Sequence, residues 1–196
     1  MDKGKTPMRM SKEARRAQIL DAAMTVFVNK GFTASTTLEI ARSANVSEVT
    51  LFRHFASKRE MFLAGVEPIM FSTLEGSISL SADLGPEEKL AYILFERISL
   101  ISRNCQVVKL ILSEAPLLAA VGGDDFMGRV IQALQKVLAL TGVTAQRETL
   151  VLRILMGSIL SFLYMPQTGE EYIRKFAGQV AAMVLSNTDQ IDREGD

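Results

Sequence analysis

Apolar residues recur along almost the whole chain at spacings of three and four, the pattern of helices that each bury one face. No run alternates between apolar and polar residues over the length of a strand, so we expect an all-α fold. The first helix is marked by Ile19, Ala23 and Phe27. It should end at Gly31, because glycine tolerates the left-handed backbone that closes many helices.

The second helix should be short and should begin after Thr36. Thr36 and Glu39 have the spacing of a capping box, in which each side chain satisfies a backbone donor of the first turn. Asn45 also tolerates the left-handed conformation and can end this helix. We expect its inward face to comprise Leu38, Ala41 and Ala44.

A third short helix should follow within three residues, with Ser47 as its N-cap and with Leu51 and Phe55 on its buried face. Two helices joined by such a turn and packed on a first helix form a helix-turn-helix. The N-terminal turn of the third helix carries small polar side chains, as a helix that enters a DNA major groove requires. The outward or sideways positions are Val49, Thr50, Arg53 and His54.

The fourth helix should start at Ser57, whose spacing from Glu60 repeats the capping box. It continues to Ile69, with a kink expected at Pro68. The boundary between a small and a large part falls inside or just after this helix. We therefore assign residues 1–60 to a DNA-binding domain with a basic N-terminal arm and residues 61–196 to a larger helical domain.

Turn-forming segments divide the rest of the chain. The segments are AP, VGGDD, TGVT and MPQTGE. The helices expected between them cover residues 87–103, 105–115, 124–141, 145–164 and 170–186.

The charges are distributed unevenly although the net charge is zero. Residues 1–60 contain 11 Lys and Arg against 6 Asp and Glu, whereas residues 61–196 contain 11 against 16. The basic part indicates an anionic partner for the N-terminal third. A single cysteine suits a reducing cytoplasm. The most apolar run, residues 151–165, carries Arg153 and is too short to span a membrane, so we expect no membrane contact.

Catalytic and metal chemistry find little support in the sequence. His54 is the one histidine, and neither a second histidine nor a cysteine accompanies it at metal-ligand spacing. Paired carboxylates, a glycine-rich phosphate loop and a nucleophile with its base are not evident. We therefore expect no enzyme activity, no metal and no cofactor. From the residues alone, His54 is best interpreted as a packed or capping side chain.

Residues 15–66 strongly resemble the DNA-binding domain of TetR-type transcriptional repressors. The shared motifs occur in order: I-L-x-A-A-x-x-x-F, K-G-F, T-T-x-x-I-A, V-S-x-x-T-L-F-x-H-F and S-K-x-x-x-F. The remaining two thirds are compatible with that family in length and helical character only. The resemblance implies a homodimer that binds a palindromic double-stranded DNA operator.

The resemblance also implies roles for individual residues, with His54 and Lys58 as phosphate contacts. Phe52 stands where a phosphate-binding tyrosine is frequent, and it lacks the hydroxyl group. Glu48 replaces a small or basic residue and would either accept from a cytosine amino group or repel phosphate. The implied DNA-binding set is Thr36, Thr37, Ser47, Glu48, Val49, Thr50, Phe52, Arg53, His54 and Lys58.

The last two helices are the expected site of dimerisation. Residues 145–164 are apolar nearly all round, and Gly157 and Ser161 would let another backbone approach. The last helix has a coiled-coil-like seam, formed by Ile173, Ala177, Val180 and Val184. Two helices from each of two chains could form the interface, although both helices could instead serve an intrachain core.

The larger domain is also the expected site of a small apolar or aromatic effector, because methionine fills adaptable cavities. The candidate lining residues are Met70, Phe71, Tyr92, Phe95, Cys105, Phe126, Met127, Met156 and Phe162. The polar candidates for orienting the effector are Tyr92, Arg97, Arg103, Glu114 and Tyr164, and the sequence does not choose among them. The leading hypothesis is a repressor released by this effector. The alternative is a DNA-binding regulator that a protein partner controls without any ligand.

Overall fold

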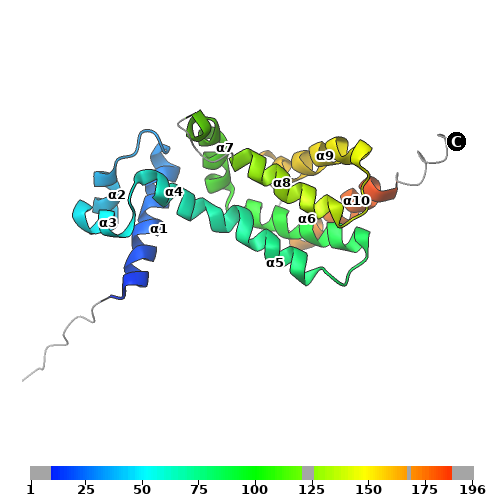
Figure 1. The fold of residues 1–196 in the computed structure, drawn as a ribbon, viewed down its shortest axis with the longest axis horizontal. Helices are drawn as coiled ribbons and strands as arrows, with labels where there is room; N and C mark the ends of the chain where they lie inside the picture. The colour runs from blue at the N-terminus through cyan, green and yellow to red at the C-terminus, as the bar shows by residue number, and fades with distance from the viewer. Residues whose placement is uncertain (1–9, 121–125, 167–168, 187–196) are drawn as a thin grey trace, which may run out of the picture. The chain divides into compact units, whose positions relative to one another are not determined.

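The computed structural model describes residues 10–120, 126–166 and 169–186, and over these residues it contains helices and no strand (Figure 1). The predicted all-α fold is confirmed. The chain divides into two compact units, Met1–Val66 and Glu67–Asp196. The division lies at the end of the fourth helix, a few residues after the boundary expected at residue 60.

The N-terminal unit contains α1 (Lys12–Lys30), α2 (Thr37–Ser43), α3 (Glu48–His54) and most of α4 (Lys58–Glu67). The predicted helix ends are confirmed. Gly31 closes α1 with a φ of 82°, and Asn45 follows α2 with a φ of 51°. Side-chain oxygens cap the start of each helix; these belong to Ser11, Thr36, Ser47 and Ser57.

The core of the N-terminal unit combines aliphatic residues with an aromatic cluster. The rings of Phe27, Phe32 and Phe62 lie with centroids 5.2–5.7 Å apart, in the tilted and edge-to-face arrangements that aromatic rings prefer. The predicted inward position of Leu38 is wrong, since its side chain is 44% exposed. Ile40 takes its place, because Ile40, Ala41 and Ala44 lie on the face of α2 that packs against α1.

The chain passes from α4 into a π-helical turn, η1 (Pro68–Ser72), and then into α5 (Thr73–Leu80). Proline has no backbone N–H and cannot complete the regular helical hydrogen-bond ladder. The disturbance expected at Pro68 therefore takes the form of a π turn rather than a simple kink.

The remaining helices of the C-terminal unit are α6 (Pro86–Arg103), α7 (Cys105–Ala120), α8 (Phe126–Ala139), α9 (Ala145–Tyr164) and α10 (Glu170–Ser186). The expected end of α7 at residue 115 is wrong, because the helix continues through Pro116 to Ala120. The leucines and alanines around Pro116 are strong helix formers, which offsets the hydrogen bond that proline removes. The VGGDD segment, residues 121–125, lies outside the described residues.

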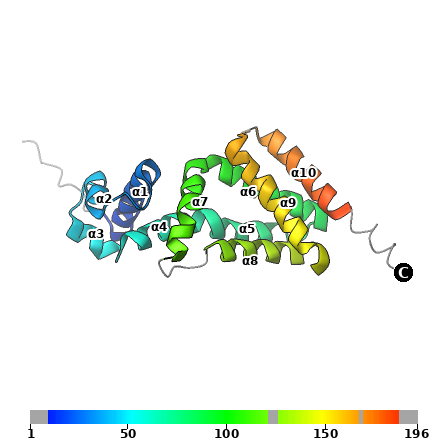
Figure 2. The same ribbon diagram turned by 90° about the horizontal axis from the view of Figure 1, so that it is seen from above.

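Helix α6 lies at the centre of the C-terminal unit and is buried along much of its length. Helix α10 packs extensively along α6, and α9 contacts α6, α8 and α10 (Figure 2). Their apolar faces form one continuous core cluster. Within the described ranges, no helix is long and apolar enough to cross a membrane.

Candidate nucleic-acid interface and internal cavity

Helix α3 is anchored by buried residues on one side and presents side chains on the other. Leu51 and Phe55 are almost completely buried, as predicted. Val49 is 65% exposed and Phe52 is 48% exposed, and the side chain of Arg53 is also exposed. An amphipathic helix of seven residues thus offers its outer face to a partner while its inner face holds it on the unit.

The N-terminus of α3 is held by a local hydrogen-bond network. Ser47 Oγ accepts from the Thr50 backbone N–H at 3.1 Å, and the two hydroxyl groups share a further hydrogen bond of 2.9 Å. This network confirms Ser47 as the predicted N-cap. It also fixes the Thr50 side chain at the beginning of the helix, where base edges are reached in a major groove.

A second polar contact joins α2 to α3. The Thr37 hydroxyl donates a 2.7 Å hydrogen bond to Glu48 Oε1. The Glu48 carboxylate is therefore oriented by the neighbouring helix. The Thr37 hydroxyl is already used, so a phosphate contact at Thr37 would have to come from its backbone N–H at the start of α2. Thr36 is likewise engaged, since its hydroxyl accepts from the Glu39 N–H in the capping box.

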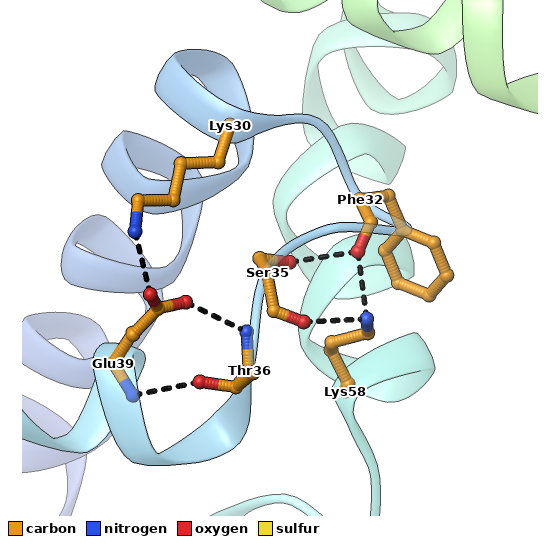
Figure 3. Close-up of polar contacts among 6 residues, drawn as sticks. All are labelled: Lys30, Phe32, Ser35, Thr36, Glu39 and Lys58. Carbon is orange, nitrogen blue, oxygen red and sulfur yellow. Dashed lines mark hydrogen bonds and ion pairs between the residues drawn. The ribbon is translucent and has the colours of Figure 1, made fainter.

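Lys58 lies inside the N-terminal unit and binds backbone carbonyl groups (Figure 3). Its Nζ donates to the carbonyl oxygens of Phe32 at 2.7 Å and Ser35 at 2.8 Å. The ammonium also lies 4.5 Å from the centroid of the Phe32 ring. Lys58 thus fastens the loop between α1 and α2 to the start of α4. A phosphate contact by Lys58 stays a prediction, and it would require the ammonium to leave these carbonyl groups.

His54 ends α3 in a half-buried position. Its carbonyl oxygen accepts a 2.8 Å hydrogen bond from Arg16, whose guanidinium lies 3.9 Å from the centroid of the Phe55 ring. Its Nδ1 atom is buried and has no hydrogen-bond partner among the described residues. A phosphate contact by His54 would therefore have to use Nε2. Much of the basic arm expected to support it, residues 1–9, lies outside the described residues.

The C-terminal unit encloses a cavity of about 60 Å³ between η1 and helices α5 to α9. Two of the predicted ligand residues, Met70 and Met156, line it. Of the polar candidates, Arg97 lines it. Sequence reasoning missed most of the wall, which is aliphatic: Ile69, Leu74, Ile101, Val108, Ile111, Leu112, Val130, Ala133, Leu134, Ile159 and Leu160.

Other predicted ligand residues lie away from this cavity. Phe162 packs edge-to-face on Phe176 between α9 and α10, with ring centroids 5.2 Å apart. Phe95 lies beneath the guanidinium of Arg174 at 4.1 Å, and Phe71 lies beneath that of Arg129 at 4.3 Å.

Two further candidates, Tyr92 and Cys105, pack against the hydrophobic core cluster and do not line the cavity. The side chains of Phe126 and Met127 lie outside the described residues. No cluster of three or more His, Cys, Asp or Glu side chains that could hold a metal ion occurs among the residues whose positions are described.

The predicted seam of α10 faces the interior of its own chain. Its four residues are at most 6% exposed and belong to the core cluster of the C-terminal unit: Ile173, Ala177, Val180 and Val184. They pack in the region where α10 lies along α6. As an interface between chains, this seam is a wrong prediction, because α6 already covers it.

Residues 19–64 match the family model of the bacterial regulatory proteins of the tetR family. Among curated proteins, the HTH-type transcriptional regulator YvkB of Bacillus subtilis is 60% identical over 42 residues, which are 21% of this chain and 22% of YvkB. The HTH-type transcriptional repressor KstR2 of Mycobacterium tuberculosis is 29% identical over 110 residues, 55% of this chain and 54% of KstR2. The matches thus span from about a fifth to about half of these relatives.

One solved structure extends the similarity of fold to most of the chain. AibR, whose crystal structure was determined in complex with isovaleryl coenzyme A and operator DNA, has a TM-score of 0.64 and 19% identity. The alignment covers 86% of this chain and 97% of the AibR chain. The N-terminal unit is therefore a helix-turn-helix DNA-binding domain joined to a larger helical unit. The N-terminal part of the chain is thus similar to the DNA-binding domain of the tetR family of bacterial regulatory proteins, and the described chain as a whole shares the fold of such regulators.

Proposed function

We propose that this regulator is a repressor that binds a palindromic operator as a homodimer and is released by a small effector. The observation that carries the proposal is the presence, in one chain, of an exposed, capped recognition helix and a separate enclosed cavity. KstR2, one of the similar proteins, is named a transcriptional repressor, which supports repression rather than activation of transcription. The AibR structure, which contains both a ligand and operator DNA, supports the use of this fold for both kinds of binding.

Sequence recognition is assigned to the first turns of α3. Thr50 and Arg53 supply a hydroxyl group and a guanidinium, and an arginine fork suits the two acceptors of a guanine in the major groove. Glu48, oriented by Thr37, is placed to accept from a cytosine amino group. Ser47 and the N-termini of α2 and α3 are suited to phosphate oxygens.

Selection of bound sequences from a random DNA pool tests this assignment. The wild-type protein should enrich an inverted repeat whose half-sites lie about one helical turn, or a multiple, apart. Arg53→Ala should relax the preference at particular base pairs by about 1–3 kcal/mol. Lys12→Ala, at an exposed position in the first turn of α1, is the matched control and should weaken binding to all DNA sequences alike. Enrichment of single, unpaired half-sites would contradict binding as a homodimer.

The dimer interface is assigned to the outer faces of α9 and α10, opposite the buried seam. Leu150, Gly157 and Tyr164 are spaced by seven along α9, and Tyr164 is 74% exposed. On α10, Tyr172 and Met183 are both exposed and lie three helical turns apart on one face. Large apolar side chains around a glycine are suited to the close approach of a second helix pair.

Gly157 gives a sharp test of this interface. A Cβ atom added at Gly157 would have no atom within 4 Å, and glycine is a poor helix former. Gly157→Gln should therefore leave the monomer intact but obstruct the approach of a second chain. Gly76 on α5 has equally open surroundings and is exposed, so Gly76→Gln is the matched control. Light-scattering chromatography should give a monomer for the first variant and a dimer for the second. A dimeric Gly157→Gln protein would place the interface elsewhere.

A further inference from the structure

The outer face of α3 carries two large apolar side chains that the N-terminal unit leaves largely uncovered. Val49 is 65% exposed and Phe52 is 48% exposed. They lie three residues apart in one helix, so they are neighbours on the same face. The inner side is supplied by Leu51 and by Phe55, which are both buried. Most of the surface of Val49 and nearly half that of Phe52 thus remain open to a partner.

A cation and a set of oriented polar groups surround this apolar pair. Arg53 is exposed and follows Val49 by four residues, so it lies on the same face one turn later. At the start of the helix, the hydroxyl groups of Ser47 and Thr50 share a 2.9 Å hydrogen bond. The outer face of α3 therefore presents two adjacent apolar side chains beside a guanidinium.

The apolar pair narrows what this face can recognise in double-stranded DNA. A phosphate contact suits neither residue, since Val49 and Phe52 have no donor, and covering a phosphate with apolar atoms would remove its water without a replacement hydrogen bond. The apolar group that the major groove presents is the C5-methyl group of thymine. A contact between this methyl group and an exposed apolar side chain removes apolar surface from water on both partners.

The spacing of the two side chains fits this contact. Residues three apart in an α-helix are separated by about 4.5 Å along its axis. Successive base pairs are separated by about 3.4 Å along the duplex. Val49 and Phe52 are therefore suited to neighbouring base pairs, with Arg53 next to them.

We propose that Val49 and Phe52 recognise the C5-methyl groups of two thymines at neighbouring base pairs, beside the base that Arg53 contacts. This inference rests on the proposed function, in which α3 enters the major groove. It adds a preference for thymine to the contacts assigned to Thr50, Arg53 and Glu48, and it gives Phe52 a role in sequence recognition that needs no hydroxyl group.

Replacement of thymidine by deoxyuridine tests the inference, because it removes the methyl group and leaves every hydrogen-bonding group of the base in place. The probe is the tightest site recovered by the full chain from the random DNA pool, with each thymidine replaced in turn. Fluorescence anisotropy measures the affinity. Replacement should weaken binding about fourfold at each of two thymidines on neighbouring base pairs, as expected for one buried methyl group.

Alanine variants assign each methyl group to a side chain. In Phe52→Ala the affinities for thymidine and deoxyuridine should become equal at one of the two positions, and in Val49→Ala at the other. Both residues are exposed, so neither change should affect folding. Leu38→Ala is the matched control, since Leu38 is an apolar residue of α2 that is 44% exposed. It should retain both deoxyuridine effects.

Phe52→Tyr separates a methyl contact from a phosphate contact. Against a thymine methyl group, the added hydroxyl group has no use and should not strengthen binding. Against a phosphate, it would donate a hydrogen bond and strengthen binding to all DNA sequences alike. That general gain would overturn the assignment of Phe52 to thymine.

Three other results would also overturn the inference. The first is a recovered site with fewer than two thymidines that are sensitive to replacement. The second is an effect that persists in both alanine variants, because the methyl group would then act through the shape of the DNA. The third is the loss of both effects in Leu38→Ala.

The outcome for the proposed function is separate. If the methyl effects follow Val49 and Phe52 but the recovered sites are single half-sites, the inference stands and binding as a homodimer fails. If an inverted repeat is recovered and deoxyuridine binds as tightly as thymidine throughout, the proposed mode of DNA binding stands and the inference fails.

Discussion

In the N-terminal unit a hydroxyl oxygen caps the start of every helix, whereas in the C-terminal unit α6 begins at Gly85 and α9 at Thr144 without any such bond. The N-terminal unit adds polar contacts between elements, from Lys58 to the loop after α1 and from Thr37 to Glu48. The C-terminal unit relies on a continuous apolar cluster. Both units bury an apolar core, and the N-terminal unit adds a side-chain cap at the start of each of its helices.

This difference explains how each unit relates to other proteins. Directional contacts require particular side chains at particular positions, and the match to the tetR family model lies in residues 19–64 of the N-terminal unit. Burial requires only apolar residues of suitable volume, and the fold as a whole matches AibR at 19% identity.

The largest expected effect tests whether the N-terminal unit also depends on its small core. Phe62 is 2% exposed and packs against Phe27 and Phe32. Phe62→Ala should lower the free energy of unfolding by about 3–5 kcal/mol, because it removes buried area and leaves a cavity. Urea denaturation measures the change. Phe52→Ala, at an exposed position of α3, is the control and should change stability by less than about 0.5 kcal/mol. Equal losses in the two variants would contradict the described core.

Lys58 provides the second test, because its two assigned roles predict different results. If Lys58 fastens the α1–α2 loop, Lys58→Met should lower the free energy of unfolding by about 1–3 kcal/mol, because it removes the hydrogen bonds to the carbonyl groups of Phe32 and Ser35, of which that of Phe32 still accepts from the Ser35 hydroxyl. As a phosphate contact alone, it should leave stability unchanged and reduce the salt slope of DNA binding by about one. Lys12→Met, at an exposed position of α1, is the control for stability. A variant as stable as the wild type would remove Lys58 from the polar framework of the unit.

The contrast between the two units also explains which predictions from the sequence were confirmed. The caps at Thr36 and Ser47, the positive φ angles of Gly31 and Asn45 and the buried pair Leu51 and Phe55 are local features, and the sequence spacing predicts them. The hydrogen bonds of Lys58 were not predicted, because its ammonium reaches carbonyl groups more than twenty residues earlier in the chain. Spacing along a helix carries no information about such a contact.

The C-terminal errors have a related cause. The 4-3-4 spacing on α10 correctly indicates a buried face, but it does not indicate whether α6 or a second chain covers that face. Phe95 and Phe162 do not line the cavity between η1 and helices α5 to α9. Phe95 instead lines a more open hollow together with Arg103 and Arg174, and Phe162 packs on Phe176. Arg97 was one of several polar candidates, and only the packing of α6 against η1 selects it.

A smaller effect sharpens the comparison of helix starts. Thr36→Ala removes the hydroxyl that accepts from the Glu39 N–H, and it should lower stability by about 1 kcal/mol. Thr144→Ala is the matched change in the C-terminal unit, where the threonine at the same cap position makes no capping bond. It should be close to neutral. Thermal unfolding of both variants measures the difference. Equal destabilisation by the two substitutions would show that the contrast in capping has no energetic meaning.

The smallest effect concerns the charge of Glu39 and its dependence on pH. The side chain of Glu39 accepts from Lys30 and from the Thr36 backbone N–H (Figure 3). The Lys30 ammonium, followed by that N–H, holds the pKa of Glu39 below its ordinary value of 4.5. A carboxyl whose pKa is depressed in the folded state contributes stability above the unfolded pKa and loses it as the pH falls through the folded pKa.

Glu39→Gln keeps a side chain that can close the capping box but removes the charge. The wild-type protein should therefore be slightly more stable than the variant near neutral pH, and the difference should decrease below pH 4.5, as urea denaturation at several pH values would measure. High salt should reduce the difference at neutral pH, because the exposed pair with Lys30 is screened. A difference that does not depend on pH would mean that the Glu39 charge contributes nothing to holding α2 in place.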